Sequence, residues 1–427
     1  MKKVLIITYY WPPAGGPGVQ RWLKFVEYLR DFDIEPVVYK PSNPDYPLQD
    51  ASLMAEIPTG ITVLEQKIFE PYFLARFFSK KNTSSISSGI IPAEGKQSFF
   101  QKMLLYIRGN FFIPDARRSW VKPSVKFLSK YIQENKIDTI ITTGPPHSVH
   151  LIGLNLSNGS GIKWVADFRD PWTQIGYHKK LKLTDSSELK HKELEQIVLD
   201  SATHIITTSF TTKDEFEKLT KTPITVITNG YDEVNPGTIE PDKSFSIAHI
   251  GSLLSGRDPK NLWEVLGELS RENPSFKQDL KLELVGAVSG EVLASIKKEG
   301  LGDNLEVKGY VSHQEAINIQ KSSQVLLLIE INSPDTRGII PGKLFEYMAA
   351  KRPILALGPE KWDVERILNE TGSGNYFNYS EREGLRHRIL AYYELYLKKS
   401  LYSESRNIEK YTRRNLTGKL SQLIKQL

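Results

Sequence analysis

The sequence of 427 residues contains no cysteine. This absence excludes disulfide bonds, thiolate nucleophiles and cysteine-ligated metals. No apolar run approaches the ~20 residues that a membrane-spanning helix needs. The start of the chain, MKKVLIITYYW, is briefly apolar but meets Trp-Pro-Pro without a small-residue cleavage site, which favours a first β-strand over a signal peptide. We therefore expect a cytoplasmic protein.

A cluster of His, Asp and Glu with the spacing of metal ligands is also lacking. Asp31 and Asp33 resemble a metal-binding Asp-x-Asp pair. They lie between an expected helix and the next expected strand, where a solvated turn is the simpler interpretation. We expect no metal and no other cofactor.

The charge is unevenly distributed along the chain. The net charge is +6, and residues 71–136 hold twelve Lys and Arg against three acids, while residues 398–427 hold eight against two. Two basic zones indicate an anionic surface as partner. The basic and aromatic stretches between residues 69 and 112 are compatible with a peripheral site at an anionic membrane. They are equally compatible with helices packed on the domain core. No nucleic-acid-binding module is recognisable, so we expect no nucleic-acid partner.

Apolar strands alternate with amphipathic helices throughout, and the alternation restarts near residue 245. This pattern predicts an α/β fold with two doubly wound parallel-sheet domains of Rossmann type. We place the N-terminal domain at residues 1–235 and the second domain at 236–397. A basic helix is expected at 398–427, a mobile Ser-rich loop at 83–88 and an interdomain hinge at 235–238.

The stretch from Arg337 to Gly358 reads as a loop, a short helix and a buried strand. Gly338, Pro341 and Gly342 interrupt the backbone, and LFEYMAA supplies good helix formers. A glycine-bearing loop that enters a helix exposes N–H groups at the positive end of the helix dipole, which suits a phosphate. Lys343 in the first turn adds a full positive charge, and the structural alternative is a solvated lysine in an ordinary α/β loop.

Other candidate residues follow expected strands, at the edge where open α/β sheets bind ligands. Gly15 and Gly16 belong to the glycine-rich turn after the first strand, where a merely tight turn is the alternative. His147 begins a helix after the Gly-Pro-Pro turn and is either a general base or a structural histidine. Asp167, Arg169 and Asp170 end another strand, and the alternative there is an internally salt-bridged turn.

The segment GKLFEYMAAKRPILAL resembles the donor-site helix of GT-B glycosyltransferases, specifically the retaining family 4, or "group 1", transferases. The same family has motifs similar to the Asn229-Gly230 turn and the Arg257…Lys260 loop. The motif Arg169-Asp170-Pro-Trp resembles a subgroup of the family from bacterial surface-polysaccharide pathways. The family's usual pair of glutamates is incomplete here, because Gly338 stands eight residues before Glu346.

This resemblance implies two domains that face a cleft and a C-terminal helix that crosses back to the first domain. It implies that Arg257, Lys343, Asp170 and His147 act in catalysis and that Asp167 and Arg169 contact the acceptor or sugar. It assigns the donor to a larger group of residues, namely Gly15, Gly16, Gly251, Lys260, Tyr310, Gly338, Ile339, Ile340 and Glu346.

The function that the resemblance implies is transfer of a hexosyl group from a nucleoside diphosphate sugar to a lipid-linked glycan acceptor, with retention. Surface-polysaccharide synthesis at the inner face of the cytoplasmic membrane is the expected setting. Two alternatives stay open: a nucleotide-sugar epimerase or hydrolase of the same fold, and a non-catalytic glycan- or lipid-binding relative.

Overall fold

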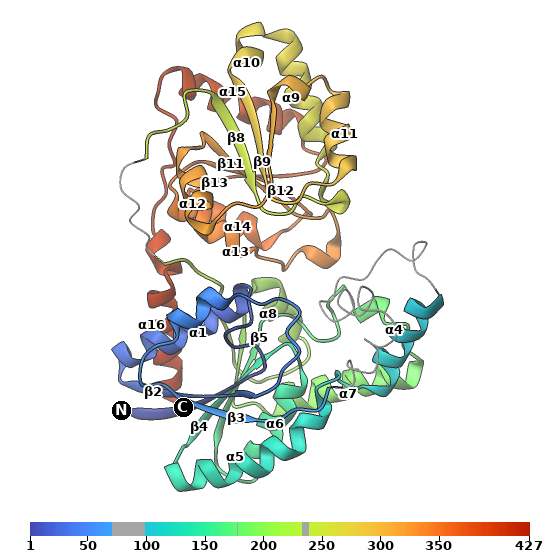
Figure 1. The fold of residues 1–427 in the computed structure, drawn as a ribbon, viewed down its shortest axis with the longest axis vertical. Coiled ribbons are helices and arrows are strands. Elements are labelled where there is room, and N and C mark those ends of the chain that lie inside the picture. Colours follow the sequence, from blue (N-terminus) through green and yellow to red (C-terminus); the bar gives the residue numbers. More distant parts are fainter. Residues whose placement is uncertain (71–98, 177, 233–238) are drawn as a thin grey trace. The chain divides into compact units, whose positions relative to one another are not determined.

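The computed structural model describes residues 1–70, 99–176, 178–232 and 239–427. This part of the chain forms two compact units (Figure 1). Unit 1 comprises residues 1–229 and 413–427, and unit 2 comprises residues 230–412. The Ser-rich loop expected at 83–88 and the hinge expected at 235–238 lie outside the described residues.

Unit 1 is built on seven parallel strands in the order β3-β2-β1-β4-β5-β6-β7. The strands are β1 (Lys2–Thr8), β2 (Ile34–Pro41), β3 (Thr62–Gln66), β4 (Thr139–Gly144), β5 (Lys163–Phe168), β6 (His204–Thr207) and β7 (Ile224–Val226). The helices are α1 (Pro17–Leu29), α4 (Phe99–Phe111), α5 (Val121–Asn135), α6 (Ser148–Ser157), α7 (Asp185–Ser201), α8 (Phe210–Phe216) and α16 (Arg413–Gln426).

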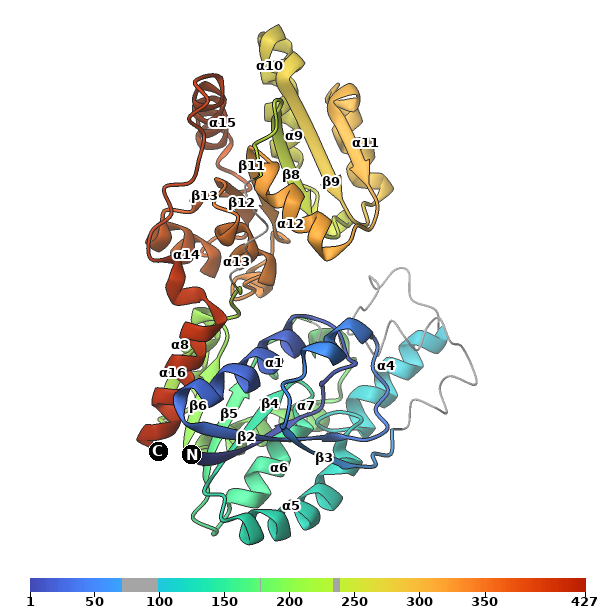
Figure 2. The same cartoon turned by 60° about the vertical axis from the view of Figure 1, so that its left-hand side comes forward.

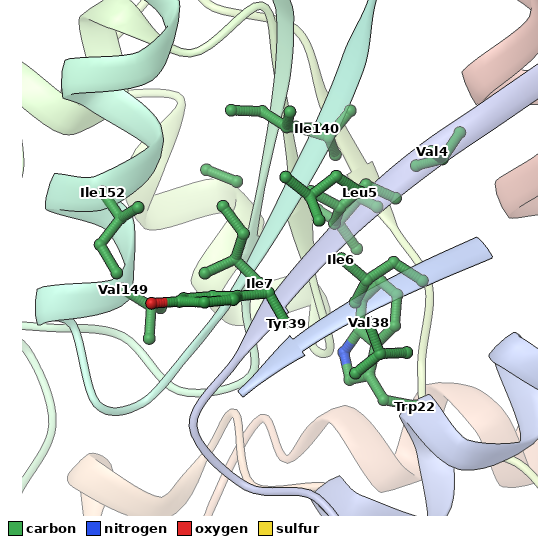
Figure 3. Close-up of a cluster of buried hydrophobic side chains, with 14 of the residues drawn as sticks. Val4, Leu5, Ile6, Ile7, Trp22, Val38, Tyr39, Ile140, Val149 and Ile152 are labelled. Carbon is green, nitrogen blue, oxygen red and sulfur yellow. The ribbon is translucent and has the colours of Figure 1, made fainter. Parts of the chain in front are cut away.

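Helices cover both faces of this sheet. Figure 3 shows Trp22 of α1 on one side of β1 and Val149 and Ile152 of α6 on the other, all within one buried cluster. Strand β1 is apolar on both faces because both are covered, which is the pattern of a central parallel strand.

The C-terminal helix α16 packs against α1 within unit 1 (Figures 1 and 2). Its apolar side, including Leu420 and Ile424, joins the core of unit 1. The helix begins at Arg413 and not at Lys398 as the sequence predicts. Residues before it belong to unit 2, because the Tyr411 ring packs 5.4 Å from Phe345 and its hydroxyl donates to Glu370 at 3.1 Å.

Unit 2 is built on six parallel strands in the order β10-β9-β8-β11-β12-β13. The strands are β8 (Phe245–Ile250), β9 (Leu280–Val285), β10 (Leu305–Lys308), β11 (Val325–Ile329), β12 (Ile354–Gly358) and β13 (Gly374–Asn378). The helices are α9 (Lys260–Glu272), α10 (Pro274–Asp279), α11 (Gly290–Lys298), α12 (His313–Ser322), α13 (Gly342–Ala349), α14 (Asp363–Thr371) and α15 (Arg382–Leu397). The predicted doubly wound parallel α/β fold is therefore confirmed in both units.

In each unit the strand order reverses at the first strand. The reversal lies between β1 and β4 in unit 1 and between β8 and β11 in unit 2. Loops that leave neighbouring strands in opposite directions open a crevice at the carboxyl ends of those strands, and open α/β sheets bind ligands there. The candidate residues lie on the loops and helices that follow these strands.

Candidate functional site

The crevice of unit 2 lies where β8 and β11 end. His249 is fully buried in β8, Gly251 follows that strand, and Glu330 follows β11 with 1% of its surface exposed. Helix α13 is fixed to the same edge by its Tyr347 hydroxyl, which accepts a hydrogen bond from the Ile250 N–H at 2.9 Å. The first turn of α13, with Lys343, is thereby held at the strand ends.

Lys343 lies against the end of β8 and donates to a neutral histidine. Its Nζ is 3.4 Å from Nε2 of His249, and His249 Nδ1 is 2.9 Å from the Leu327 carbonyl. A carbonyl can only accept, so Nδ1 carries the ring proton and Nε2 accepts from the ammonium. A Cβ at Gly251 would lie 2.6 Å from Nζ, so the absence of a side chain there makes room for the ammonium.

The charge of Lys343 is not neutralised by an ion pair. Among the described residues, no carboxylate lies within ion-pair distance of the half-buried ammonium. Burial, with a smaller contribution from Arg257, lowers the pKa of Lys343 to about 8, and burial lowers the pKa of His249 to about 3. A cation in this setting gains free energy from an anionic ligand that supplies the missing countercharge.

Arg257 stands beside this lysine and is held by Glu330. Its Nε and Nη2 lie 3.1 and 3.0 Å from Glu330 Oε1, and the same oxygen accepts from the Ile331 N–H at 2.8 Å. Glu330 is fully buried while Arg257 is partly exposed, so the carboxylate orients the guanidinium and leaves part of it accessible. The structure thus places Gly251 against Lys343, with Arg257 near enough to influence the pKa of that lysine.

Lys260 is the first residue of α9 and is exposed. It lines a polar cavity of about 400 Å³ together with Asp258, Ser295 and Tyr379. The cavity also includes residues next to Arg257 and Glu330, so Lys260 borders the crevice without a hydrogen bond or ion pair to the Lys343 cluster.

The remaining donor candidates surround α13 at different depths. Glu346 is half-buried and accepts from Gln320 Nε2 at 3.2 Å. Gly338 and the buried Ile340 belong to the loop before α13, and the Ile339 carbonyl accepts from Trp362 Nε1 at 2.6 Å. Tyr310 is 90% exposed in the loop between β10 and α12. No described contact joins Tyr310 to the Lys343 cluster.

Sequence analysis missed three members of this crevice. His249, Glu330 and Gln320 hold Lys343, Arg257 and Glu346 respectively. A histidine inside the apolar strand FSIAHI and a glutamate ending VLLLIE were the available signals, because a polar group in such a strand needs a partner.

In unit 1, the glycine-rich loop follows β1 and His147 follows β4. Gly16 caps α1 with a φ of +107°, which favours glycine, and a Cβ at Gly15 would meet Leu48 at 3.2 Å. His147 is the N-cap residue of α6. Ser148, the first residue of that helix, donates hydrogen bonds from its N–H and its hydroxyl to Asp115, both at 2.8 Å.

His147 is a buried histidine whose ring nitrogens have no hydrogen-bond partner among the described residues. Its ring stacks on Trp172 with centroids 4.9 Å apart. Burial lowers the pKa of His147 well below its ordinary 6.5, so the imidazole is neutral near pH 7. A neutral ring with two free nitrogens can donate to and accept from a ligand hydroxyl.

The three candidate residues at the end of β5 have different surroundings. Asp167 is fully buried, and its carboxylate accepts from Arg21 and from Trp22 Nε1, each at 2.8 Å. Its oxygens are engaged internally, so the structure favours the salt-bridge interpretation over the predicted acceptor contact. Asp167 has these partners because it lies within β5, where α1 covers the strand.

Arg169 and Asp170 lie beyond the strand. Arg169 donates to the carbonyls of Gly144 and Pro145 at the end of β4 and fits against Gly18, where a Cβ would lie 1.6 Å from its Nη1. Asp170 is half-buried, and no hydrogen bond joins it to another described residue. Burial raises the pKa of Asp170 although Arg169 opposes the shift. Arg169 therefore fixes the loop, and Asp170 is the carboxylate that stays available.

No group of three or more His, Cys, Asp or Glu within the described ranges has the geometry to hold a metal ion. The anion-binding capacity of the unit 2 crevice comes from Lys343, Arg257 and the first turn of α13, where no side chain caps the helix.

Comparisons with known proteins agree with this architecture. Residues 90–234, about a third of the chain, match the model of Glycosyltransferase Family 4. None of the curated proteins compared with the chain matches it in sequence.

Three solved structures illustrate the similarity in fold. Sucrose-phosphate synthase from Thermosynechococcus elongatus is 12% identical with a TM-score of 0.60, over 100% of this chain and 99% of that one. A structure from E. coli described as trehalose-6-phosphate bound with UDP-2-fluoro glucose is 11% identical with a TM-score of 0.60, over 100% and 99%. A putative UDP-N-acetylglucosamine 2-epimerase from Listeria monocytogenes is 11% identical with a TM-score of 0.56, over 100% and 96%. The chain therefore has the GT-B fold of two parallel-sheet α/β domains.

Proposed function

We propose that this protein is a glycosyltransferase that moves a hexosyl group from a nucleoside diphosphate sugar to a glycan acceptor. The observation that carries the proposal is the half-buried Lys343 ammonium, which faces a neutral histidine and has no carboxylate partner among the described residues. A diphosphate supplies the missing negative charge. The partial match to Glycosyltransferase Family 4 and the GT-B fold support the same conclusion.

The residues of unit 2 would stabilise the leaving nucleoside diphosphate. When the bond between the sugar's anomeric carbon and the diphosphate oxygen breaks, negative charge grows on the diphosphate. Lys343 and Arg257 would stabilise that charge more in the transition state than in the ground state. Glu346, held by Gln320, would accept hydrogen bonds from the ribose hydroxyls. Because side chains supply the countercharge, we expect turnover to survive EDTA.

The residues of unit 1 would serve the sugar and the acceptor. We assign His147 to a hydroxyl of the transferred sugar, because neither ring nitrogen has a hydrogen-bond partner among the described residues. We assign Asp170 to the acceptor, because it is the available carboxylate after β5. Retention of anomeric configuration, a lipid-linked acceptor and a role in surface polysaccharide remain parts of the proposal that rest on the family resemblance.

Membrane association would be peripheral. Within the described part of the chain, no helix combines the length and the apolar character that crossing a bilayer requires. The basic zones would instead contact the anionic inner leaflet, where each cation contributes on the order of 1 kcal/mol.

A nucleotide-sugar epimerase or hydrolase is the second candidate, favoured by the fold similarity to the putative 2-epimerase. Nucleotide release measured with and without a glycan acceptor separates the possibilities. A transferase releases nucleoside diphosphate only with acceptor, and a hydrolase releases it without. An epimerase isomerises the sugar without acceptor. A non-catalytic relative binds the nucleotide and does none of these.

A further inference from the structure

A second hollow lies on unit 1, on the helices that follow the glycine-rich crevice in sequence. It has a volume of about 830 Å³ and is bordered by the end of α4, by α5 and α6, and by one residue of α7. Its walls are mainly apolar and include Phe69, Phe111, Phe112, Ala116, Val121, Val125, Leu151, Leu154 and Leu194. Pockets of a few hundred to a thousand Å³ with apolar walls hold small ligands and single chains.

The rim of this hollow is cationic. Arg118, Lys122 and Lys126 line it and are exposed. None of the three forms an ion pair with another described residue. The two lysines are four residues apart on α5, so they project from the same side of that helix. The hollow therefore combines an apolar interior with positive charge at its border that no described residue neutralises.

The described face of α4 continues the apolar surface. Met103, Tyr106, Ile107 and Phe111 follow one another at helical spacing, and all are exposed, Phe111 by 68%. The other side of α4 packs through Leu105 on Leu181. Phe111 belongs both to this stripe and to the hollow, so the two form one continuous surface. Such a stripe beside cations suits the boundary between lipid headgroups and acyl chains.

We propose that this hollow receives an acyl chain of an anionic phospholipid, with the lipid phosphate at Arg118, Lys122 and Lys126 and the α4 stripe in the membrane interface. The inference deepens the peripheral membrane contact of the proposed function by naming its site and its lipid. Charge complementarity favours this occupant over an apolar helix of a protein partner, which would offer no negative charge to the three cations. Lys and Arg stems can lie along apolar surface while their charged ends reach the phosphates.

The experiment is vesicle sedimentation of the full chain at low salt, without nucleotide sugar. Vesicles are made of phosphatidylcholine alone or with phosphatidylglycerol. The wild type should bind the anionic vesicles and not the neutral ones. K122E/K126E should weaken that binding by at least about tenfold, because two attractive charges become repulsive. The charge-matched control K163E/K221E changes two exposed lysines outside the hollow and should stay within about twofold of the wild type.

Two further variants separate chain insertion from charge alone. Leu154→Trp fills the hollow without changing charge and should weaken binding by about tenfold. Phe111→Ser removes the exposed aromatic and should act similarly. Leu189→Ser changes an exposed leucine of α7 outside the hollow and should not. Thermal unfolding of each variant checks that it remains folded.

Several results would overturn the inference. One is equal binding of the wild type to neutral and anionic vesicles. Another is a loss of binding in K122E/K126E that is no larger than in its control. A third is undiminished binding by folded Leu154→Trp. Self-association that Phe111→Ser abolishes, without vesicle binding, would assign the surface to a second copy of the chain. Because no nucleotide sugar is present, each of these outcomes leaves the test of transferase activity separate.

Discussion

At the scale of single residues, Lys343 determines how the unit 2 crevice responds to pH. Its pKa of about 8 lies below the ordinary 10.5 because burial disfavours the charged form. A bound diphosphate would raise this pKa again, so below pH 8 the lysine is charged with or without ligand. Above pH 8 the free protein has lost the proton, and binding must take one up.

The affinity for a nucleoside diphosphate should therefore fall above pH 8, by up to about tenfold per pH unit. The fall should end where the pKa of the bound state is reached. Calorimetric titration between pH 6.5 and 9.5 measures the slope, and Lys343→Arg, which stays charged, should flatten it. If the affinities of the wild type and of Lys343→Arg were equally independent of pH, Lys343 would not be a contact of the ligand.

Substitutions at residues with different roles should have different effects on kcat and KM. Arg257→Ala and Lys343→Ala remove charge that acts on the leaving group, so kcat should fall by about 10²-fold or more. Glu346→Ala removes a contact that changes little during reaction, so it should mainly raise the KM for the donor. Circular dichroism checks folding. Near-wild-type kcat in folded Arg257→Ala and Lys343→Ala would contradict the assignment.

The two charges of the crevice were predictable from sequence, but their supports were not. Lys343 follows a glycine-bearing loop at a helix start, which is a local signal. His249 is 94 residues from Lys343, and Glu330 is 73 residues from Arg257. These pairs meet only because β8 and β11 are neighbours in the sheet. Asp167 was misjudged for a similar reason, because its partner Arg21 is 146 residues away.

At the scale of elements, the loop after β8 depends on a glycine. Gly251 has a φ of +128°, and a Cβ there would lie 2.6 Å from Lys343 Nζ. Gly251→Ala should therefore cost about 1–3 kcal/mol of stability through backbone strain and weaken nucleotide binding by displacing the ammonium. Gly256→Ala is the matched control, since its Cβ would meet nothing nearer than 3.7 Å. Denaturant unfolding and calorimetry test both variants, and equal behaviour of the two would contradict this account of the loop.

The loop, helix and strand of residues 337–358 followed the sequence prediction closely, with α13 at Gly342–Ala349 and β12 at Ile354–Gly358. Glycine, proline and a run of helix formers are local determinants, so a short window contains them. The structure of residues 398–427 was harder to predict from sequence. Residues 398–412 carry the same basic composition as α16, yet Tyr411 ties them to unit 2 through Phe345 and Glu370.

At the scale of the whole molecule, the chain returns to unit 1 after unit 2 and ends there as α16. Leu420 of α16 is fully buried in the core of unit 1. Leu420→Ala should destabilise unit 1 by about 2–5 kcal/mol and leave nucleotide binding by unit 2 intact. Urea unfolding followed by Trp fluorescence tests this, with the exposed Lys425→Ala as control. Unchanged stability of Leu420→Ala would mean that α16 is dispensable for unit 1.

The alternation of apolar strands and amphipathic helices was sufficient to predict two parallel-sheet domains, because each βα step is a local pattern. The same pattern contains little about which side chains meet across the sheet. Even so, the reversal of strand order in each unit falls at the strands after which Gly15, His147, Gly251 and Lys343 are found. The general location of the site was therefore accessible from sequence, and its hydrogen-bond network was not.

The most direct test of the account is a thermal-shift measurement of the full chain with nucleoside diphosphates, repeated on Lys343→Ala. A ligand that binds only the native state stabilises it by about 2.7 kcal/mol at a hundredfold excess over its Kd. We predict that at least one nucleoside diphosphate raises the Tm of the wild type and that Lys343→Ala, folded by circular dichroism, loses most of that rise. No rise with any nucleoside diphosphate at millimolar concentration, or an undiminished rise in Lys343→Ala, would contradict the assignment of this crevice to a nucleotide sugar.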